Sequence, residues 1–378
     1  MPIGLFLGAG CPLSIKIETN GTSSPLIPGI SGLTKQVCDK CKCDENYKKS
    51  FAILLSHFEK DGRQNPTIED ILSHLRALHQ VAGSETVRGL TASELRTLDQ
   101  MICNEISNLM TRTLPDYKTP YHKIASWIGA IPRGSAIQIF TTNYDLLMEQ
   151  ALEDSRVPFF DGFIGSFHTF FDSHAMEDDI LPNRWVRLWK LHGSINWHLD
   201  DRGNVSRGEI EIEDSLQRRL IHPSHLKYDE SRMMPYLAMI DRLRAFFKQP
   251  SCILITNGYS FSDQHINQIM IEGLKGNPTA SIFAMLYGNL NKYPQAIGLS
   301  LGRSNLSLLA QNEAIIGTRR ALWMETKETE PNGLPYAVDW IMKSVVNDIK
   351  QAQLNLGDFA NFGNFLADIV GGEERLGR

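Results

Sequence analysis

The sequence predicts an α/β protein built on a mostly parallel sheet with helices on both faces. Short apolar runs that end at glycine or polar residues alternate with segments of helical spacing, which is typical of such sheets. The first two of these runs lie much farther apart than the roughly 30 residues of a βαβ unit. We therefore expect a large helical insertion after the first strand, and a C-terminal helical extension after the last one.

Composition and charge narrow the class of protein. The chain has 378 residues, of which 42% are hydrophobic and 21% charged, as in ordinary globular proteins of two to three domains. Its net charge of -5 argues against a globally basic nucleic-acid binder, so we expect no direct sequence-specific nucleic-acid binding. No apolar run approaches the about 20 residues that cross a bilayer, and residues 1–11 lack the basic start of a signal peptide. We expect a cytoplasmic protein without membrane contact.

The first predicted strand, Ile3–Leu7, stops at a glycine turn, and the next, Ala136–Phe140, follows only after the insertion. Residues 11–46 are rich in Gly, Pro, Ser and Thr and predict loops. Apolar residues at helical spacing, a capping-box pattern and a Thr-Pro start then predict four helices. These helices are Tyr47–Lys60, Thr67–Leu78, a helix from Thr91 to about Leu114, and Pro120–Ile131.

Strands and helices alternate after the insertion. The strands are expected at Arg187–Leu191, Cys252–Thr256, Ser281–Leu286 and Leu306–Leu309. The helices are expected at Asp145–Glu153, at Met233–Phe247, from Ser262-Asp263 to about Leu274, at Tyr336–Leu354 and at Asp358–Val370. The resulting division is a discontinuous core of residues 1–30 and 132–320, an insertion of residues 31–131 and an extension of residues 321–378.

Four clusters of glycine or polar residues follow predicted strands. They are Gly8-Ala9-Gly10, Thr142-Asn143-Tyr144-Asp145, His192-Gly193-Ser194 and Gly258-Tyr259-Ser260. Ligands bind beyond the carboxyl ends of the strands in open parallel sheets, so we expect the clusters to converge on one site.

Each cluster taken alone has a second interpretation. The glycines can bring a backbone close to a pyrophosphate, or they can form a plain tight turn. Thr142 or Asn143 can cap the following helix, with Asp145 favouring its first turn. His192 has the residue type of a general base near neutral pH, or it is a structural histidine bonded to backbone.

Cys38-x-x-Cys41-x-Cys43 has zinc-ligand spacing, but a structural zinc site needs four ligands. The other cysteines stand alone at positions 11, 103 and 252. The charged residues between the three suggest an exposed loop instead, so zinc and loop remain the alternatives.

Taken in order, the four clusters resemble the sirtuin family, in particular its bacterial NADase branch used in anti-phage defence. Sirtuins carry a GAG turn, a (T/Q)N-x-D segment, an HG segment and a late G-x-S segment. The helical stretch Thr67–Leu72 also looks like a segment that such NADases carry in their insertion. The resemblance covers about residues 1–290 and implies a Rossmann-like NAD-binding core.

By this resemblance, Asn143 and His192 match the catalytic pair, and Asp145 matches the carboxylate of the nicotinamide pocket. The expected NAD-binding residues are Gly8, Ala9 and Gly10 at the pyrophosphate, Gly258 and Ser260 at the nucleotide ribose, and the neighbours Thr142, Tyr144, Gly193, Ser194 and Tyr259. NAD is the expected substrate, and no metal is expected. Pro12 stands where the family usually has serine.

The resemblance implies NAD+ hydrolysis to nicotinamide and ADP-ribose. One alternative is a regulatory subunit that binds NAD or ADP-ribose without turnover. A third reading, NAD-dependent protein deacylation, is disfavoured because deacetylating sirtuins carry a four-cysteine zinc module after the histidine, and here only Cys252 follows His192.

The size and arrangement of the chain resemble the sirtuin subunit paired with a HerA-type hexameric ATPase. This likeness implies a gated defence effector that depletes NAD, a homo-oligomer and an ATPase partner. The last predicted helix carries Phe359, Phe362, Phe365 and Leu366, which either form a docking surface or pack on the protein's own core.

Overall fold

The computed structural model describes residues 1–19, 21–83, 85–178, 180–199, 204–208, 218–221, 235–324, 337–342 and 350–371. Within these residues, nine strands form one sheet in the order β18-β17-β16-β15-β14-β1-β6-β10-β7. The strands from β16 to β7 pair in parallel, and β17 and β18 are antiparallel additions at one edge. The predicted α/β class is therefore confirmed. The strands are β1 (Ile3–Leu7), β6 (Gln138–Thr141), β7 (Phe159–Phe160), β10 (Val186–Lys190), β14 (Ile253–Asn257), β15 (Ser281–Met285), β16 (Leu306–Leu309), β17 (Glu313–Ile316) and β18 (Arg319–Leu322).

Alternate residues of β1 point to the two faces of the sheet and enter two apolar cores. Leu5 and Leu7 pack in the core that holds α5 (Pro120–Ala130), α6 (Leu147–Asp154) and α12 (Phe359–Ile369). Phe6 packs in the other core, with α9 (Tyr236–Lys248), α10 (Gln264–Gly276) and α11 (Pro294–Leu301). Both faces are thus covered, as predicted.

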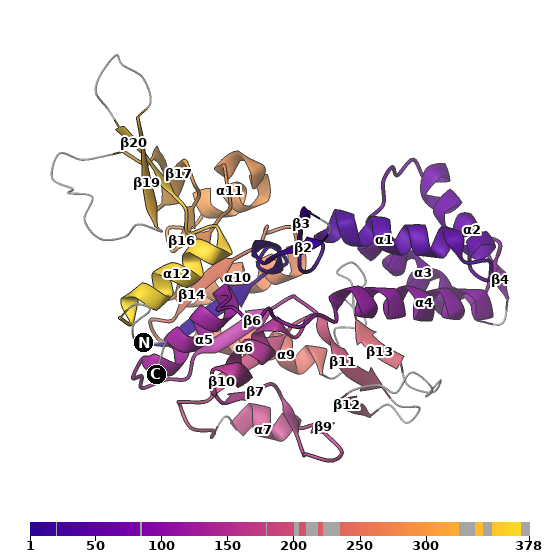
Figure 1. Ribbon diagram of the computed structural model, residues 1–378, viewed down its shortest axis with the longest axis horizontal. Coiled ribbons are helices and arrows are strands. Elements are labelled where there is room, and N and C mark those ends of the chain that lie inside the picture. Colours follow the sequence, from indigo (N-terminus) through magenta and orange to yellow (C-terminus); the bar gives the residue numbers. More distant parts are fainter. Residues whose placement is uncertain are drawn as a thin grey trace.

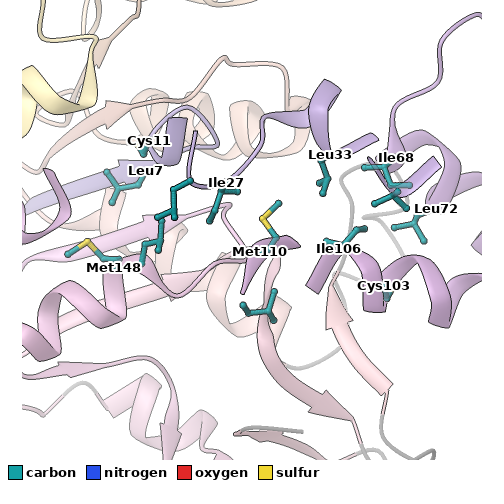
Figure 2. Close-up of a cluster of buried hydrophobic side chains, with 14 of the residues drawn as sticks. Leu7, Cys11, Ile27, Leu33, Ile68, Leu72, Cys103, Ile106, Met110 and Met148 are labelled. Atoms are coloured by element: carbon teal, nitrogen blue, oxygen red, sulfur yellow. The ribbon is translucent and has the colours of Figure 1, made fainter. Parts of the chain in front are cut away.

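The insertion forms a helical region that projects from the sheet (Figure 1). Its helices are α1 (Ile30–Cys43), α2 (Lys48–Lys60), α3 (Ile68–Ala82) and α4 (Ala92–Met110), with the short hairpins β2 (Lys16–Thr19)–β3 (Thr22–Pro25) and β4 (Thr86–Val87)–β5 (Leu90–Thr91) beside them. The core around β1 continues without a break into this region. Figure 2 follows it from Leu7 on β1 to Ile106 on α4.

Strands β7, β17 and β18, helix α11 and the hairpins β2–β3 and β4–β5 were not predicted. Several smaller elements were not predicted either. They are η1 (Pro12–Ser14), β8 (Phe163–Ile164), β9 (Phe170–Phe171), α7 (Ser173–Asp178), β11 (Gly193–Leu199), β12 (Val205–Arg207), β13 (Arg218–Ile221) and η3 (Leu290–Lys292). Strands β12, β11 and β13 form a small antiparallel sheet that follows β10 directly. Strands β8, β9 and β12 have only two or three residues, which is too short to show a clear periodicity in the sequence.

The prediction of loops over residues 11–46 was wrong for its second half. Residues Ile30–Cys43 form α1, because Leu33, Val37 and Cys41 stand four residues apart and bury one face of the helix. Cys38 and Cys41 therefore lie on a helix rather than in an exposed loop, with Cys41 buried and Cys43 exposed. The Cys41 thiol contacts Met101 Sδ of α4 at 3.3 Å.

The predicted helix over Tyr336–Leu354 was also wrong. The chain forms two antiparallel strands there, β19 (Val338–Met342) and β20 (Lys350–Leu354), with Trp340 opposite Ala352. Val338, Trp340 and Ile341 are residue types that favour strands, and this preference outweighed the helical spacing of the apolar positions. The predicted start of the helix at Met233 lies outside the described residues, which resume at position 235.

The phenylalanines of α12 were expected either to form a docking surface or to pack on the protein's own core. Phe359, Phe362 and Leu366 are each at most 3% exposed and pack in the core around α5. The Phe359 ring meets Tyr121 edge-on at 4.8 Å between centroids, and a Cβ on Gly363 would touch Pro120. This face of α12 is therefore internal packing and not a docking surface.

Candidate functional site

A cavity of about 230 Å³ opens at the carboxyl ends of the central strands. Nine of the thirteen residues predicted for the site line it: Ala9, Thr142, Asn143, Tyr144, Asp145, His192, Gly258, Tyr259 and Ser260. The other four, Gly8, Gly10, Gly193 and Ser194, are not among the lining residues and lie in the turns that hold these side chains. The four clusters thus converge, while the chemical roles of their members remain predictions.

The glycines of the first cluster let two strand-end turns pack against each other. The Gly8 amide donates to Asn257 O and the Gly10 amide to Gly258 O, each at 2.9 Å. A Cβ on Gly8 would lie 2.4 Å from Gly258 O, so a larger residue has no room. Gly258 itself has φ +66, a conformation that favours glycine. The two glycine amides are therefore engaged with backbone, and Ala9 is the residue of this turn that faces the cavity.

Pro12, where the resemblance led us to expect a serine, opens the short helix η1 and also lines the cavity. Proline has the fixed φ that suits a first helical position. The nearest serine, Ser14, turns its hydroxyl to Cys11 O at 2.8 Å.

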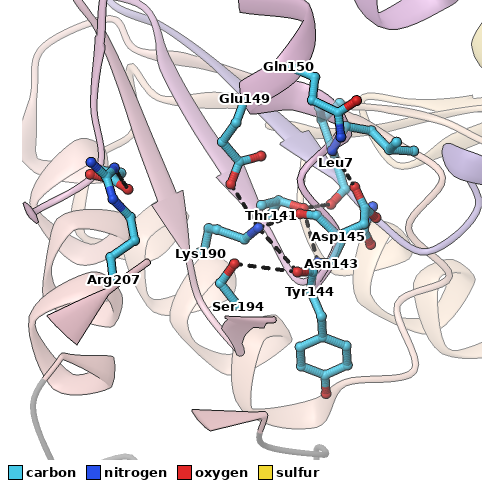
Figure 3. A network of polar contacts seen from close by, with 12 residues as sticks. Leu7, Thr141, Asn143, Tyr144, Asp145, Glu149, Gln150, Lys190, Ser194 and Arg207 are labelled. Carbon is cyan, nitrogen blue, oxygen red and sulfur yellow. Dashed lines mark hydrogen bonds and ion pairs between the residues drawn. The ribbon is translucent and has the colours of Figure 1, made fainter. Parts of the chain in front are cut away.

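Asn143 is fixed by its neighbours. Its Nδ2 donates to Gly8 O at 3.1 Å, and its backbone amide donates to Thr141 Oγ1 at 3.0 Å. The Thr141 hydroxyl in turn donates to Leu7 O at 2.9 Å (Figure 3). These bonds tie the side chain of Asn143 to the first glycine turn and set its direction in the cavity.

His192 follows β10 and is paired with an acidic residue that the sequence interpretation treated only as a helix cap. Its Nε2 lies 3.1 Å from Asp263 Oδ2. The other oxygen, Asp263 Oδ1, accepts bonds from the amides of His265 and Ile266 at 3.0 and 3.2 Å and so begins α10. A carboxylate held by a helix start and bonded to an imidazole fixes the tautomer and the orientation of the ring. The cap pattern was visible in the sequence, but the contact with His192 needed the fold.

Asp145 is buried at the start of α6, where its Oδ1 accepts the Leu147 amide at 3.0 Å. Burial raises the pKa of Asp145 to about 6, and the nearby Lys190 ammonium opposes this rise. The carboxyl group therefore changes charge close to physiological pH, unlike an exposed aspartate.

A buried lysine holds the turn that carries Tyr144 and Asp145. Lys190 Nζ donates to the backbone oxygens of both residues and pairs with Glu149 Oε1 at 2.9 Å (Figure 3). Burial also raises the pKa of Tyr144. Lys190 and Glu149 position this side of the cavity without lining it, and no pattern in the sequence indicates that they pair.

The opposite wall of the cavity comes from the helical region and is mostly apolar. It consists of Ile27, Pro28, Gly29, Ile30, Leu33, Ile68, Glu69, Leu72, Ile106 and Met110. The resemblance pointed to residues 67–72, and three of them line the cavity, whereas the contributions of α1 and α4 were missed. Glu69, the only acidic group of this wall among the described residues, is part-exposed, and its charge acts on the half-buried Tyr144.

Comparison with known protein families fits this geometry. Residues 137–301 match the SIR2-like domain. The matched stretch thus includes three of the four clusters, while Gly8-Ala9-Gly10 and the whole helical region from α1 to α4 lie outside it. SIR2-like domains are NAD-dependent enzymes, so the match supports a sirtuin-like family and an NAD-related function. No curated protein matches the chain.

Two further observations concern only the described residues. They contain no group of three or more His, Cys, Asp or Glu side chains placed to hold a metal ion, and this includes Cys38, Cys41 and Cys43. None of their helices is both long and apolar enough to span a membrane.

Proposed function

We propose that the chain is an NAD+ hydrolase that cleaves the N-glycosidic bond to nicotinamide and releases nicotinamide and ADP-ribose. The observation that carries this proposal is that Asn143 and His192 line the same cavity beside the glycine turn, with His192 oriented by Asp263. A site that only binds NAD has no need of a histidine held by a carboxylate at the reaction centre.

The cavity volume of about 230 Å³ favours one end of the dinucleotide. Cavities that enclose drug-sized ligands measure roughly 300–1,000 Å³. The nicotinamide riboside end would enter the cavity, near Asn143, Asp145 and His192. The pyrophosphate would pass Ala9, and the nucleotide ribose would lie near Gly258 and Ser260.

The reaction requires little beyond binding, orientation and one proton transfer. Nicotinamide leaves as a neutral molecule when the bond from its ring nitrogen to the ribose breaks, and the ribose is left with oxocarbenium character. Water adds to that carbon, and its proton leaves, so NAD+ and water give nicotinamide, ADP-ribose and one proton. The Asn143 amide orients the water and a ribose hydroxyl, and His192 accepts the proton from one of them. Ionised Asp145 stabilises the positive charge, and protonated Asp145 donates to the carboxamide.

The experiment is nicotinamide release from NAD+ by the purified full-length chain and by Asn143→Ala. Asn104→Ala, on the exposed side of α4, is the matched control. We expect wild-type and control chains to release nicotinamide, alone or together with the partner proposed below, and Asn143→Ala to lose most of this activity. Full activity in Asn143→Ala would contradict the role of Asn143. Measurable NAD+ binding with no product under any condition would favour the binding-only subunit.

We also propose that the activity is gated in a homo-oligomer, with a HerA-type hexameric ATPase as partner, and that the protein acts in the cytoplasm as an anti-phage effector. An ungated NADase would deplete the NAD of its own cell. Strand β18 supports self-association, because it is the last strand of the described sheet and its residues are exposed. An edge strand presents backbone N–H and C=O groups with which another chain can pair. Light scattering on the isolated chain tests the oligomer, and a stable monomer would contradict it.

A further inference from the structure

A second cavity, of about 630 Å³, lies at the amino ends of the strands of the sheet. It is lined by residues that precede the strands β6, β7 and β10, whereas the first cavity is lined by residues that follow strands. The lining residues are Lys118, Ser126, Gly129, Ala130, Ile131, Pro132, Arg133, Ser155, Arg156, Val157, Pro158, Arg184 and Val370.

The charges around this cavity have one sign. Four of its described lining residues are basic, namely Lys118, Arg133, Arg156 and Arg184, and none of them is acidic. The acidic residue next to it in sequence, Asp154, is not a lining residue and lies 3.0 Å from His122 Nε2. A concave surface lined by one sign of charge concentrates counter-ions of the opposite sign.

Arg133 is the strongest indication that this cavity binds an anion. Its Nε and Nη1 atoms are buried, and neither has a hydrogen-bond partner among the described residues. Partial burial lowers the pKa of Arg133, as expected for a half-buried cation without an anion beside it. Buried nitrogen atoms of guanidinium groups are normally hydrogen-bonded, because leaving them without an acceptor costs desolvation free energy.

Helix ends account for part of this arrangement but not for Arg133. Helices α5, α6 and α12 all end at this cavity, at Ala130, Asp154 and Ile369. Helix C-termini attract cations, so exposed lysine or arginine side chains nearby need no ligand. The two buried N–H groups of Arg133, however, would find acceptors in any such interaction, and they have none.

Arg156 occupies a position where glycine is usual. It has φ +53, directly after α6, and the flanking bonds from Val157 N to Leu152 O and from Arg156 N to Glu153 O form a Schellman motif. A non-glycine residue in this left-handed conformation is strained. Strained residues of this kind cluster at ligand sites, where the position of the side chain is part of the function.

We propose that this cavity binds a small molecule carrying two or more phosphate groups, held through those phosphates by Arg133, Arg156 and Arg184. Guanidinium forks match phosphate oxygens in pairs, so bound phosphate would satisfy Arg133. The volume is within the range of small-molecule sites. The described lining contains no aromatic ring, so recognition rests on the phosphates and not on stacking of a base. This site is separate from the proposed NAD site and does not depend on NAD hydrolysis.

The first test is calorimetric titration of the full-length chain with pyrophosphate. We expect binding in the wild type, and binding about tenfold or more weaker in Arg133→Gln. Arg96→Gln, an exposed arginine on α4, is the matched control, and His192→Ala reports on the other cavity. Both should bind like the wild type. Equal affinity in wild type and Arg133→Gln, or loss of binding only in His192→Ala, would overturn the proposal.

Titrations with other phosphate compounds distinguish which class of ligand the cavity binds. Orthophosphate should bind more weakly than pyrophosphate. ATP that binds like pyrophosphate indicates that phosphates alone are read, and ATP that binds more tightly indicates a nucleotide. Arginine-dependent binding of duplex DNA with no binding of pyrophosphate or ATP would overturn the small-molecule assignment.

Thermal unfolding separates a ligand site from a structural role for Arg133. Without ligand, Arg133→Gln should unfold at the same temperature as the wild type or higher, because an unpaired buried charge is removed. Pyrophosphate should raise the Tm of the wild type and not that of the variant. A large fall in Tm without ligand would show that Arg133 is structural. The double variant Arg156→Gln/Arg184→Gln changes exposed side chains and repeats the binding test if Arg133→Gln folds poorly.

Discussion

The two cavities of this protein lie at opposite ends of the strands of the same sheet, and their charged and polar side chains are arranged differently. At the carboxyl ends of the strands, the polar side chains are paired: His192 with Asp263, and Lys190 with Glu149. At the amino edge, four basic residues gather without an acidic lining residue among those described, and two nitrogen atoms of Arg133 have no partner.

This difference indicates which kind of ligand interaction each cavity can make. A site whose charges are already paired can orient a substrate without further reorganisation, which suits bond cleavage. A site whose cations lack partners gains its missing interactions only when an anion arrives, which suits binding. The comparison makes opposite predictions for substitutions at the two edges.

The largest expected effect is on the reaction. His192→Ala should lower the rate of nicotinamide release by about 10²–10⁴-fold, the usual contribution of a general base. His174→Ala, an exposed histidine on α7, is the matched control and should leave the rate unchanged. Equal rates in the two variants would remove His192 from the mechanism.

A substitution at the paired edge should cost stability. Lys190→Met removes a buried ammonium and leaves Glu149, whose side chain is 13% exposed, without its partner. We expect a loss of about 3–5 kcal/mol in the free energy of unfolding, measured with urea. Arg133→Gln at the other edge should show no such loss. If both variants lost similar stability, the contrast between the two edges would be wrong.

The buried carboxyl group of Asp145 predicts a dependence of stability on pH. Its pKa of about 6 lies above the unfolded value of about 3.9, so the folded state binds the proton more tightly. The contribution of this proton is complete below pH 4 and is lost as pH rises through 6. Asp145→Asn should therefore match the wild type at pH 4 and exceed its free energy of unfolding by about 2–3 kcal/mol at pH 7.5. An equal difference at both pH values would contradict the raised pKa.

The smallest effect concerns Asp263. Asp263→Asn keeps an oxygen for the start of α10 but weakens the hold on His192, and we expect nicotinamide release to fall about 10–100-fold. Asp358→Asn is the matched control, because Asp358 caps α12 with bonds of 2.8 and 3.1 Å in the same way and lies elsewhere. Similar activity in both variants would show that Asp263 acts only as a cap.

The sequence predicted the central fold well, because buried parallel strands and long amphipathic helices leave strong local patterns. The helix α5 was expected at Pro120–Ile131 and is found at Pro120–Ala130, and β16 was expected and found at Leu306–Leu309. The prediction failed where local preference and apolar spacing disagree, as in β19 and β20. It also failed for α1, because cysteines and polar residues surround the few apolar positions that form the buried face of this helix.

The candidate site was predictable in part for a similar reason. Polar residues directly after strands must gather at one edge, so the four clusters could be named from the sequence. The pairing of His192 with Asp263 and the apolar wall from α1, α3 and α4 depend on contacts between distant segments. The second cavity was not predicted at all, because its basic residues lie in separate loops with no shared spacing.

The most direct test of the central claim is the product balance of NAD+ incubated with the purified chain. Mass spectrometry of the mixture, without any acylated peptide, should find nicotinamide and ADP-ribose in equal amounts, both lost in Asn143→Ala and in His192→Ala. If NAD+ stayed intact with and without the proposed ATPase partner, or if nicotinamide appeared only when an acyl-lysine peptide was added, NAD+ hydrolysis would be contradicted.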